Sequence, residues 1–587
     1  MGRFEPVDLN VSFTRQEEEI LAFWRRERIF ETLRARNHGR PHWSFIDGPM
    51  TANNPMGVHH AWGRTYKDVF QRYRAMLGFD QRYQNGFDCQ GLWLEVETEK
   101  ELGFNSKQDI ESFGLEKFSR ACRARVEKYA GIIAEQSARL GQWMDWDHSY
   151  FTLTDANIEH IWHFLGVCQD KGWLRQGHSV MPWCTRCGTS LSQHELTDSY
   201  QEIDDTSVFL GFKLRPGARR EGPWLEALEG RRPARLPGEN ERLLVWTTTP
   251  WTLTSNTAAA VNPDLAYARI EHEGIVYYAS AGVAAQVFRG QGKVLETIPG
   301  WEMVGWVYDG PFDDLPAQKA VEHVVVPWDL VGETEGSGIV HIAPGCGAED
   351  HELGDAFGLA SIAPLNGAGI YLDCFGWLSG RDVHDVEEPI FEDLKKKGLF
   401  VRRESYRHRY PFCWRCHEKL VFRTEDEWFI RCDEIRPRMK EAAYQVRWIP
   451  ESVGKRTQDW YDNMGDWCIS RKRYWGLPLP FYLCPDGHLT LARTKAHLRE
   501  IAVDPATVDA LPELHRPWID SVMVRCQHHG CGRTAARTPT SATAGSTRGS
   551  SPTRRSTTST TASTGRSGSR PRSSRRCASR CGSGSTP

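Results

Sequence analysis

Two pairs of cysteines have the spacing of metal ligands. Cys184 and Cys187 enclose two residues, and so do Cys413 and Cys416. Together the pairs provide four thiolates, which is the tetrahedral donor set that structural zinc prefers. Zinc binding offsets the cost of ordering two distant loops, so the long segment between the pairs is no obstacle. The sequence therefore predicts a structural zinc on these four thiolates, with four free thiols as the alternative.

A second metal site is indicated further along the chain. Its candidate ligands are Cys484, Cys526 and Cys531. The possible fourth ligands are His488, His528 and His529. Because the spacing is irregular, we predict the three thiolates and leave the fourth donor open.

Two adjacent histidines, His59 and His60, follow a predicted strand over residues 43–47 and a polar loop. Apolar periodicity predicts a helix from about residue 60 through residue 76. The N-terminus of a helix favours phosphate, and an imidazole there can donate to phosphate oxygens as negative charge develops. The pair is therefore a candidate catalytic site, and a structural or surface role is the alternative.

Strands and helices alternate around these histidines as a parallel sheet requires. A second strand is predicted over 80–84, and helices are predicted over 12–36, 114–140 and 157–172. Between residues 206 and 401, short apolar runs with Gly and Pro breaks predict a mixed β domain. The predicted fold class is α/β: a Rossmann-type parallel-sheet domain, interrupted by a mixed β domain and zinc-ribbon elements.

The run from residue 45 to residue 68 resembles the first signature of class I aminoacyl-tRNA synthetases, a His-x-Gly-His motif at the start of the ATP-binding helix. The match places His60 on the second signature histidine, Gly57 on the first and His59 on the glycine. Residues 467–478, Trp-Cys-Ile-Ser-Arg-Lys-Arg-Tyr-Trp-Gly-Leu-Pro, are similar to a segment of the branch that handles Ile, Val and Leu. The resemblance implies that His59 and His60 act on ATP.

The segment Gly-Phe-Asp-Cys-Gln-Gly-Leu at residues 86–92 looks like the isoleucyl version of a motif that holds the amino-acid substrate. The resemblance implies that Asp88 binds the substrate ammonium and that Pro49 lines the same pocket. A carboxylate is the expected partner for an amino group in a partly dry pocket. The Asp-Cys pair and the Arg-Tyr-Trp-Gly run favour isoleucine over the valyl and leucyl alternatives.

The predicted β domain carries a Thr-Thr-Thr-Pro-Trp-Thr run at 247–252 and a Gly-rich segment at 336–350. Both resemble the editing domain of the same branch. A hydrophobic pocket distinguishes Ile from Val by about 1–3 kcal/mol, so a second, hydrolytic site must remove valyl products. The resemblance implies that Asp350 anchors the ammonium of the wrong amino acid while the other residues shape the pocket and place water. The candidate editing residues are Thr247, Thr248, Thr249, His341 and Asp350.

The resemblance implies an isoleucyl enzyme that activates isoleucine with Mg²⁺-ATP, transfers it to tRNA and hydrolyses mischarged valyl-tRNA. Its expected partners are the tRNA acceptor end, isoleucine and ATP. No apolar run is long enough to span a membrane, and the N-terminus lacks an apolar signal core, so we expect a cytoplasmic monomer.

Charge is distributed unevenly along the 587 residues. The net charge is -3, but residues 533–587 contain eleven Arg and no acidic residue, so residues 1–532 carry about -3 - 11 = -14. The Arg-, Ser- and Thr-rich tail contains no large aliphatic or aromatic residue, which predicts disorder. A change of reading frame near residues 533–541 explains this composition, and a basic arm for nucleic acid is the alternative.

The resemblance covers about residues 10–532. The second ATP signature, Lys-Met-Ser-Lys-Ser, and the anticodon-binding domain that follows it are absent from the 587 residues, which predicts a truncated or frameshifted version. The predicted divisions are a helical brace at 1–40, the first half of the catalytic domain with the first zinc knuckle at 41–195, an editing domain at 196–405, the second knuckle and the return to the catalytic domain at 406–480, a second zinc element at 481–532 and the tail at 533–587.

Three other functions are compatible with parts of the sequence. The first is a valyl or leucyl synthetase. The second is a fragment that only binds or deacylates tRNA, because its editing motifs are complete and its ATP motifs are not. The third is a zinc-ribbon nucleic-acid-binding protein with a basic arm, which has no use for the editing motifs.

Overall fold

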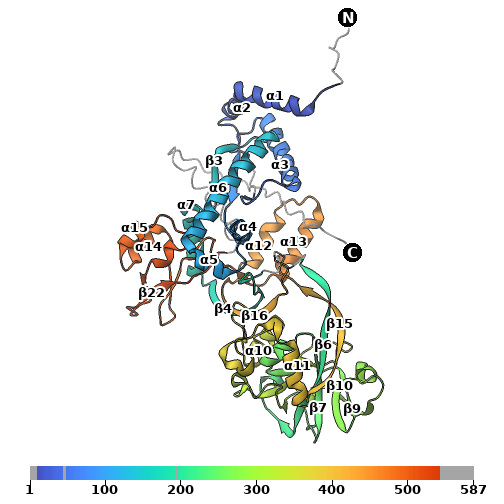
Figure 1. The fold of residues 1–587 in the computed structure, drawn as a ribbon. Coiled ribbons are helices and arrows are strands. Elements are labelled where there is room, and N and C mark those ends of the chain that lie inside the picture. The colour runs from blue at the N-terminus through green and yellow to red at the C-terminus, as the bar shows by residue number, and fades with distance from the viewer. Residues whose placement is uncertain (1–9, 44–47, 192–195, 197–198, 415, 543–587) are drawn as a thin grey trace. The chain divides into compact units, whose positions relative to one another are not determined.

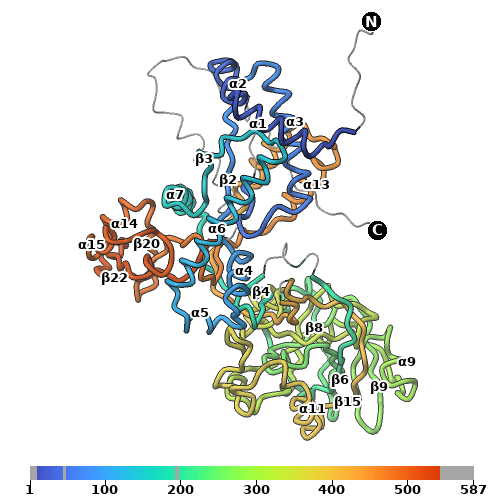
Figure 2. Tube along the Cα trace, turned by 45° about the horizontal axis from the view of Figure 1, so that its top comes forward, coloured from blue at the N-terminus to red at the C-terminus, as the bar shows by residue number. Residues whose placement is uncertain are grey.

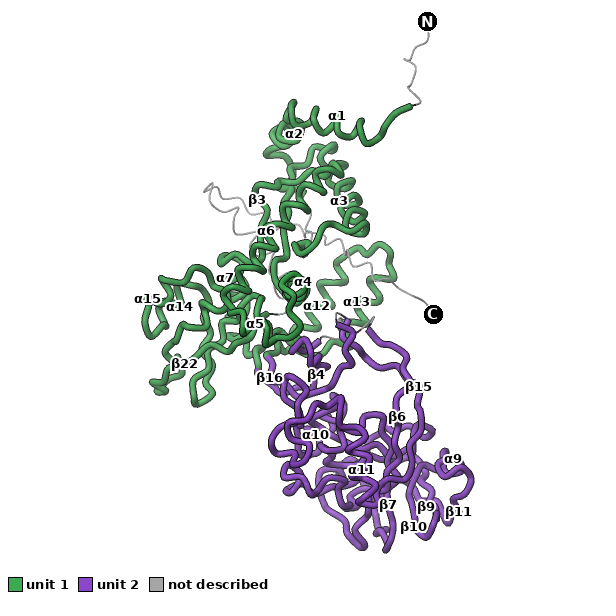
Figure 3. The backbone as a smooth tube through the Cα atoms, viewed as in Figure 1, with its two compact units in different colours: residues 1–175, 428–587 green, residues 176–427 purple. Residues whose placement is uncertain are grey.

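The computed structural model describes residues 10–43, 48–191, 196, 199–414 and 416–542. The chain divides into two compact units, which Figure 3 colours separately. Unit 1 consists of residues 1–175 and 428–587, and unit 2 consists of residues 176–427. Unit 2 extends beyond the predicted domain at 196–405 on both sides, because the residues around both cysteine pairs belong to it.

Unit 1 begins with helices and a parallel sheet. Its elements up to residue 170 are α1 (Phe13–Arg26), α2 (Ile29–Asn37), β1 (Met50–Thr51), α3 (Val58–Met76), β2 (Gln84–Asp88), α4 (Leu92–Leu102), α5 (Lys107–Phe113), α6 (Leu115–Arg139), β3 (Asp145–Phe151) and α7 (Asp155–Asp170). The sheet has the order β1-β2-β3, and its neighbours are parallel. Parallel strands need crossover connections, which α3 supplies before β2 and which α4, α5 and the long helix α6 supply before β3 (Figure 1).

Three predicted helices are confirmed to within two residues at each end. The ranges 60–76, 114–140 and 157–172 correspond to α3, α6 and α7. The predicted helix over 12–36 is instead two helices, because Arg28 takes a left-handed conformation with a φ of 49°. A non-glycine residue in that region interrupts a right-handed helix.

The second predicted strand is wrong in position. Residues 80–83 are not part of the strand, and β2 begins at Gln84 and ends at Asp88. Tyr83 has a φ of 53°, which prevents an extended strand from running through this segment. Asp88 is therefore the last residue of a strand rather than part of the loop after it. Of the first predicted strand at 43–47, residues 44–47 lie outside the described residues.

The second segment of unit 1 contains two helices followed by a small α/β module. Its elements are α12 (Arg436–Tyr444), α13 (Glu451–Asn463), β17 (Trp467–Cys468), β18 (Ser470–Arg471), β19 (Phe481–Leu483), β20 (Leu489–Leu491), α14 (Lys495–Ile501), α15 (Pro505–Asp509), β21 (Val524–Arg525), β22 (Thr534–Arg537) and β23 (Ser541–Ala542). The module's sheet has the order β20-β19-β22-β21, and Figure 2 shows β20 and β22 gathered with α14 and α15. Its core includes Trp162 of α7, so the two segments of unit 1 share one interior.

The prediction that a disordered tail begins at Arg533 is wrong for residues 533–542. These residues form β22, which pairs with β19 and β21, and β23, which pairs with β18. Ala535 and Ala542 are buried, so small side chains fill this part of the core where the sequence shows no large apolar residue. The remainder of the predicted tail, 543–587, lies outside the described residues.

Unit 2 is built on one large sheet. The chain enters it within β4 (Leu174–Cys184) and leaves it within β16 (Val421–Ile430). Its other main elements are β5 (Thr189–Ser190), β6 (Tyr200–Arg219), β7 (Glu241–Thr247), β8 (Ala258–Val261), β9 (Ala266–His272), β10 (Ile275–Ser280), α9 (Ala284–Val287), β11 (Lys293–Pro299), β12 (Trp306–Tyr308), β13 (His323–Pro327), β14 (Val340–Ile342), α10 (Ala348–Phe357), α11 (Glu387–Lys396) and β15 (Phe400–Pro411). Figure 1 shows the long strands β6 and β15 side by side.

Six strands of this sheet close into a ring. The sheet order is β11-β9-β10-β7-β14-β8-β13-β12-β6-β15, and β6 also pairs with β7. The six strands of the ring are therefore β7, β14, β8, β13, β12 and β6. Closure removes the free edges of these strands, and the apolar core of the unit includes buried side chains from β6, β7, β8 and β13. Among the described residues, every helix is too short or too polar to traverse a lipid bilayer.

Candidate functional site

The sheet of unit 1 brings a buried carboxylate to the carboxyl ends of its strands. Asp88 ends β2, and its register partner in β1 is Thr51. The Thr51 hydroxyl lies 3.3 Å from Asp88 Oδ2, and the Thr152 hydroxyl lies 3.5 Å from Asp88 Oδ1. Pro49, directly before β1, is also buried. In open α/β sheets, ligands bind outside the carboxyl ends of the strands, and Asp88 lies at such an end.

The two predicted catalytic histidines lie together in the first turn of α3. Gly57 is the N-cap, and its backbone N–H donates to His60 Nδ1 over 3.1 Å. Burial, together with the neighbouring His59 and nearby cations, lowers the pKa of His60. A neutral His60 that accepts at Nδ1 carries its proton on Nε2 and can donate it to a ligand. His59 is exposed, and its ring centroid lies 3.9 Å from that of His60.

Trp475 connects two of the predicted motifs in unit 1. Its indole N–H donates to the Cys89 carbonyl over 2.8 Å, and its backbone N–H donates to Glu95 over 2.5 Å. The segment 467–478 therefore contacts Cys89, the residue that directly follows Asp88.

A histidine that was not among the predicted site residues lies beside this contact. His515 is buried, stacks on Trp475 with centroids 4.7 Å apart, and places its Nε2 2.5 Å from the Gln90 amide nitrogen. Burial lowers the pKa of His515 to about 3, so the ring is neutral and can accept the Gln90 amide hydrogen. A single histidine outside any motif gives no sequence signal for this role.

In unit 2, most of the predicted editing residues lie at one end of the closed sheet. Thr247 ends β7, and parallel pairing of Trp246 with Val340 in β14 places His341 beside it. The Thr247 and Thr249 hydroxyls are 3.3 Å apart, and the Thr249 and Thr252 hydroxyls are also 3.3 Å apart. The Thr252 hydroxyl then lies 2.9 Å from His341 Nε2, which completes a chain of polar groups.

Thr252 was not among the predicted site residues, and Thr248, which was, is not part of this chain of contacts. The signal for Thr252 was present, because it stands three residues after Thr249, one turn of the 3-10 helix over Pro250–Ser255. Burial lowers the pKa of His341 to about 4, so the imidazole is neutral. Its Nδ1 is buried and has no hydrogen-bond partner among the described residues, which leaves it available to a ligand or water.

Asp350 lies at the same end of β14. It belongs to the first turn of α10, and its Oδ2 accepts the Ala343 backbone N–H over 2.8 Å. A Cβ at Gly347 would lie 2.8 Å from the Asp350 carboxyl carbon, so glycine leaves room for the carboxylate. Burial raises the pKa of Asp350 to about 6. A desolvated carboxylate of this kind gains most from a cationic partner.

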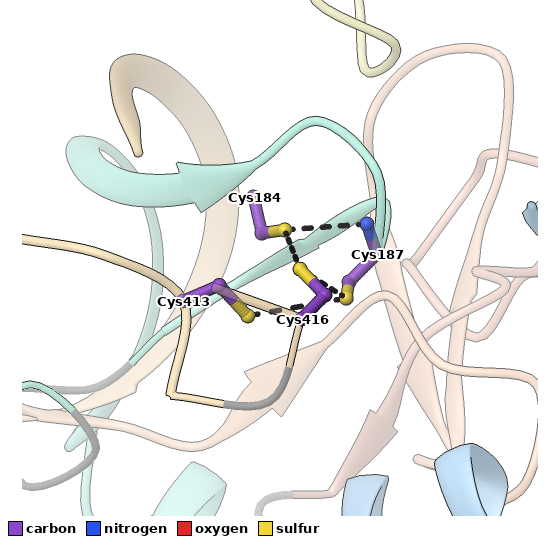
Figure 4. A group of neighbouring side chains, drawn as sticks. All are labelled: Cys184, Cys187, Cys413 and Cys416. Atoms are coloured by element: carbon purple, nitrogen blue, oxygen red, sulfur yellow. Dashed lines mark hydrogen bonds between the residues drawn. The ribbon is translucent and has the colours of Figure 1, made fainter. Parts of the chain in front are cut away.

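The four cysteines of the two predicted knuckles converge within unit 2 (Figure 4). Their Sγ atoms are 3.4 Å apart for Cys184 and Cys416, 3.5 Å for Cys187 and Cys416, and 3.9 Å for Cys187 and Cys413. Four sulfurs at Zn–S distances of about 2.3 Å stand about 3.8 Å from one another, so this donor set fits a tetrahedral zinc. The crowded thiols share hydrogen bonds that lower the pKa of Cys413 and raise that of Cys184.

The second group of ligands converges within unit 1, and it includes His488. Cys484 Sγ lies 3.5 Å from His488 Nδ1 and 3.8 Å from Cys531 Sγ, and Cys526 completes the group. A Cys₃His zinc site needs sulfur–nitrogen separations of about 3.6 Å, so these donors fit as well. The ring of His528 stacks on that of His488, with centroids 3.9 Å apart.

The sequence belongs to a known family of proteins. A family model described as tRNA synthetases class I (I, L, M and V) matches residues 19–510, and the chain belongs to this family. It is 38% identical over 540 residues to an isoleucine–tRNA ligase of Streptomyces avermitilis, and the match covers 92% of this chain and 49% of the relative. It is 35% identical over 529 residues to that of Methanothermobacter thermautotrophicus, covering 89% and 48%. The chain thus spans about half the length of the curated relatives it matches.

A crystal structure of a ternary LeuRS-tRNA-LeuAMS complex from Agrobacterium radiobacter K84 resembles the chain with a TM-score of 0.37 and 13% identity. The match covers 91% of this chain and 59% of that one. Membership of the family follows from the sequence matches.

Proposed function

We propose that the chain carries the amino-acid, ATP and editing sites of an isoleucyl-tRNA synthetase. The proposed reaction joins isoleucine to ATP as the adenylate, transfers the isoleucyl group to tRNA, and hydrolyses valyl-tRNA made in error. The observation that carries the proposal is Asp88, buried at the carboxyl end of β2 and hydrogen-bonded by Thr51 and Thr152. The isoleucine–tRNA ligases among the relatives support the choice of substrate.

Asp88 is proposed to hold the ammonium group of isoleucine. The two threonine hydroxyls fix the carboxylate, and a charge-assisted hydrogen bond to an ammonium is worth more than a neutral one. Pro49, buried at the entrance to β1, is proposed to line the same pocket. Holding the amino acid here orients its carboxylate toward ATP, and orientation of this kind supplies much of the rate of a bimolecular step.

The N-terminus of α3 is proposed to hold the phosphates of Mg²⁺-ATP. The free N–H groups and the helix dipole favour negative charge, and neutral His60 offers its Nε2–H to a phosphate oxygen. Gly57 has no side chain to offer a phosphate, and exposed His59, whose ring lies against that of His60, is proposed to donate in its place. Donors aimed at charge that develops on the phosphates stabilise the transition state more than the ground state.

The polar chain in unit 2 is proposed as the editing site. Asp350 would anchor the ammonium of a mischarged valyl group, while His341 and Thr252 place a water for hydrolysis. His341 stays neutral at pH 7, so it can accept a proton from that water at Nδ1 once the tautomer places its hydrogen on Nε2. The Thr247, Thr248 and Thr249 run would limit the size of the bound side chain.

Isoleucine-dependent ATP–pyrophosphate exchange tests the proposed activation directly. The expected result is exchange with isoleucine that Asp88→Asn reduces by at least about 100-fold, because the ammonium loses its charged partner. Asp80→Asn is the matched control, since Asp80 precedes β2 and lies outside the site. Exchange supported by leucine but not isoleucine would contradict the proposed substrate.

A second candidate function is deacylation alone. The observation that favours it is the complete Thr247–Thr249–Thr252–His341 chain within a unit that has its own core. Hydrolysis of valyl-tRNA by a chain with no exchange activity would select this function. Asp350→Ala should then abolish hydrolysis, whereas Asp88→Asn should leave it unchanged.

A further inference from the structure

Unit 1 contains a pocket that the proposed reaction does not use. It has a volume of about 400 Å³ and is formed by α6, the start of α7 and the segment that follows α15. Pockets of this size hold small organic ligands. Its lining residues include neither Asp88 nor the histidines of α3, so it is separate from the proposed sites for isoleucine and ATP.

The walls of this pocket carry charges of both signs. Arg120 and Arg123 of α6 supply two cations. Asp155, the first residue of α7, and Glu513 supply two carboxylates. Arg123 is ion-paired with Glu513, and Asp155 Oδ1 accepts the Leu514 backbone N–H over 3.0 Å. Because the four charges balance, the pocket is complementary to a ligand that carries both a positive and a negative group.

The charged groups are placed for the two ends of such a zwitterion. The Arg120 side chain is 63% exposed, and it pairs with Glu116, which is 53% exposed. Exposed ion pairs contribute little to stability, so this guanidinium can turn to a ligand carboxylate. The N-terminus of the 16-residue helix α7 favours a carboxylate at the same place. Glu513 is only 12% exposed, and its carboxylate suits an ammonium group.

The remaining wall of the pocket is apolar. Leu153 is buried, and Pro512 and Trp518 face it from the segment after α15. The Arg120 guanidinium lies over the Trp518 ring, 5.4 Å from its centroid. An aliphatic side chain would lose contact with water among these three residues, which favours its binding. A ligand with two opposite charges and one aliphatic group is an apolar α-amino acid.

The pocket also borders the buried histidine beside the Asp88 segment. His515 Nδ1 lies 3.7 Å from Glu513 Oε2 and has no hydrogen-bond partner among the described residues. Its Nε2 lies 2.5 Å from the Gln90 amide nitrogen. A neutral ring that accepts at Nε2 carries its hydrogen on Nδ1, the atom nearer Glu513. A ligand carboxylate that takes Arg123 from Glu513 would leave Glu513 able to accept this hydrogen.

We propose that this pocket binds an apolar α-amino acid at a site distinct from the one at Asp88. The ligand carboxylate binds Arg120 and Arg123, and the ligand ammonium binds Glu513. Glu513 then also accepts from His515 Nδ1, which holds the His515 ring on Gln90 more firmly. The proposal needs no part of the proposed function, because these contacts involve neither Asp88 nor ATP.

The test uses the 587-residue chain with Asp88→Asn, which removes the charged partner at the proposed substrate site, and L-isoleucine as the probe. Ligand-observed NMR titration should show binding to one site. Isoleucinol, which lacks the carboxylate, and the deaminated acid, which lacks the ammonium, should each bind at least about 10-fold more weakly, because each loses a charge-assisted contact. The histidine ring signal that His515→Gln removes should shift when L-isoleucine is added.

A pair of variants of α6 locates the binding. Arg120→Gln in the same chain should weaken the binding of L-isoleucine at least about 10-fold. Its side chain is exposed, so the fold should be retained. Lys128→Gln is the matched control, because Lys128 is an exposed cation of α6 outside the pocket, and it should bind as the chain without this change does.

Four results would overturn the proposal. They are the absence of binding up to about 10 mM L-isoleucine, equal binding of the deaminated acid, binding that Arg120→Gln leaves unchanged, and a His515 signal that does not shift. Binding that depends on Arg120, in a chain whose parent shows no ATP–pyrophosphate exchange, would reject the proposed function and support this site.

Discussion

Gln90 and His515 are 425 residues apart in sequence, yet the Gln90 amide nitrogen lies 2.5 Å from His515 Nε2. His515 is held against Trp475 by stacking at an interplanar angle of 10°. Trp475 in turn donates to the carbonyl of Cys89, the residue between Asp88 and Gln90. Two distant segments, around Trp475 and around His515, thus fix the residues that follow the proposed substrate carboxylate.

His515→Ala should lower the free energy of unfolding by about 2–4 kcal/mol. The change leaves a cavity beside Trp475 and removes the buried partner of Gln90, and each effect is destabilising. Urea denaturation followed by tryptophan fluorescence measures the loss. His163→Ala, at an exposed position of α7, is the control and should change the value by less than about 0.5 kcal/mol. Equal losses in the two variants would contradict the packing role of His515.

The same histidine should make stability depend on pH. Burial lowers the pKa of His515 to about 3, against 6.5 for an ordinary histidine. Between these values the unfolded chain binds a proton that the folded chain does not, so this stabilisation decreases as the pH falls below 6.5. The slope is about 1.4 kcal/mol per pH unit. The stability advantage of the parent over His515→Gln should therefore shrink by about 2 kcal/mol between pH 6.5 and pH 5, and a constant difference would contradict the prediction.

Sequence patterns predicted the parts of the site that are local. The cysteine pairs at 184–187 and 413–416 have the spacing of zinc ligands, which can be read from the sequence without knowledge of the fold. The Thr residues at 247–249 are consecutive, so they can be recognised in the same way. The contribution of His515 could not be predicted, because an isolated histidine has no period and its partner lies in another segment. His488 could not be chosen over two other histidines either. The fold makes this choice. In the turn between β19 and β20, the Cys484 N–H donates to the His488 carbonyl, and this turn places the His488 ring beside the thiolates.

The two cysteine-rich groups should bind two zinc ions per chain. Cys413→Ser should remove one equivalent and Cys484→Ser the other, because each site then keeps only three donors. Elemental analysis of freshly purified, reduced protein measures the content. Cys374→Ser, at an exposed cysteine outside both groups, is the control and should keep two equivalents. A Cys413→Ser protein that retains both ions would exclude the four-thiolate site.

Hydrolysis of valyl-tRNA should weaken below pH 6. Burial raises the pKa of Asp350 to about 6, so the carboxyl group is increasingly neutral at lower pH and cannot pair with the ammonium of the substrate. The KM for deacylation should rise about tenfold per pH unit below 6. Asp350→Asn should lower kcat/KM by about 100-fold at pH 7.5 and abolish this pH dependence. Glu349→Gln changes the exposed neighbouring carboxylate and should do neither.

The structured end of unit 1 at 533–542 supplies the last prediction. Arg537 is buried, donates to Asp520 through Nε over 2.7 Å, and lies in β22 between β19 and β21. A chain that ends after Gly532 loses this strand and leaves Asp520 with Arg516 as its remaining cationic partner. The 1–532 chain loses this ion pair, the pairing of β22 with β19 and β21, and the burial of Ala535, so it should unfold at a clearly lower urea concentration than the 1–542 chain. It should also release zinc from Cys484 and Cys531 more readily, since β22 follows directly after Cys531. Equal unfolding midpoints and equal zinc retention would mean that β22 contributes nothing to the module.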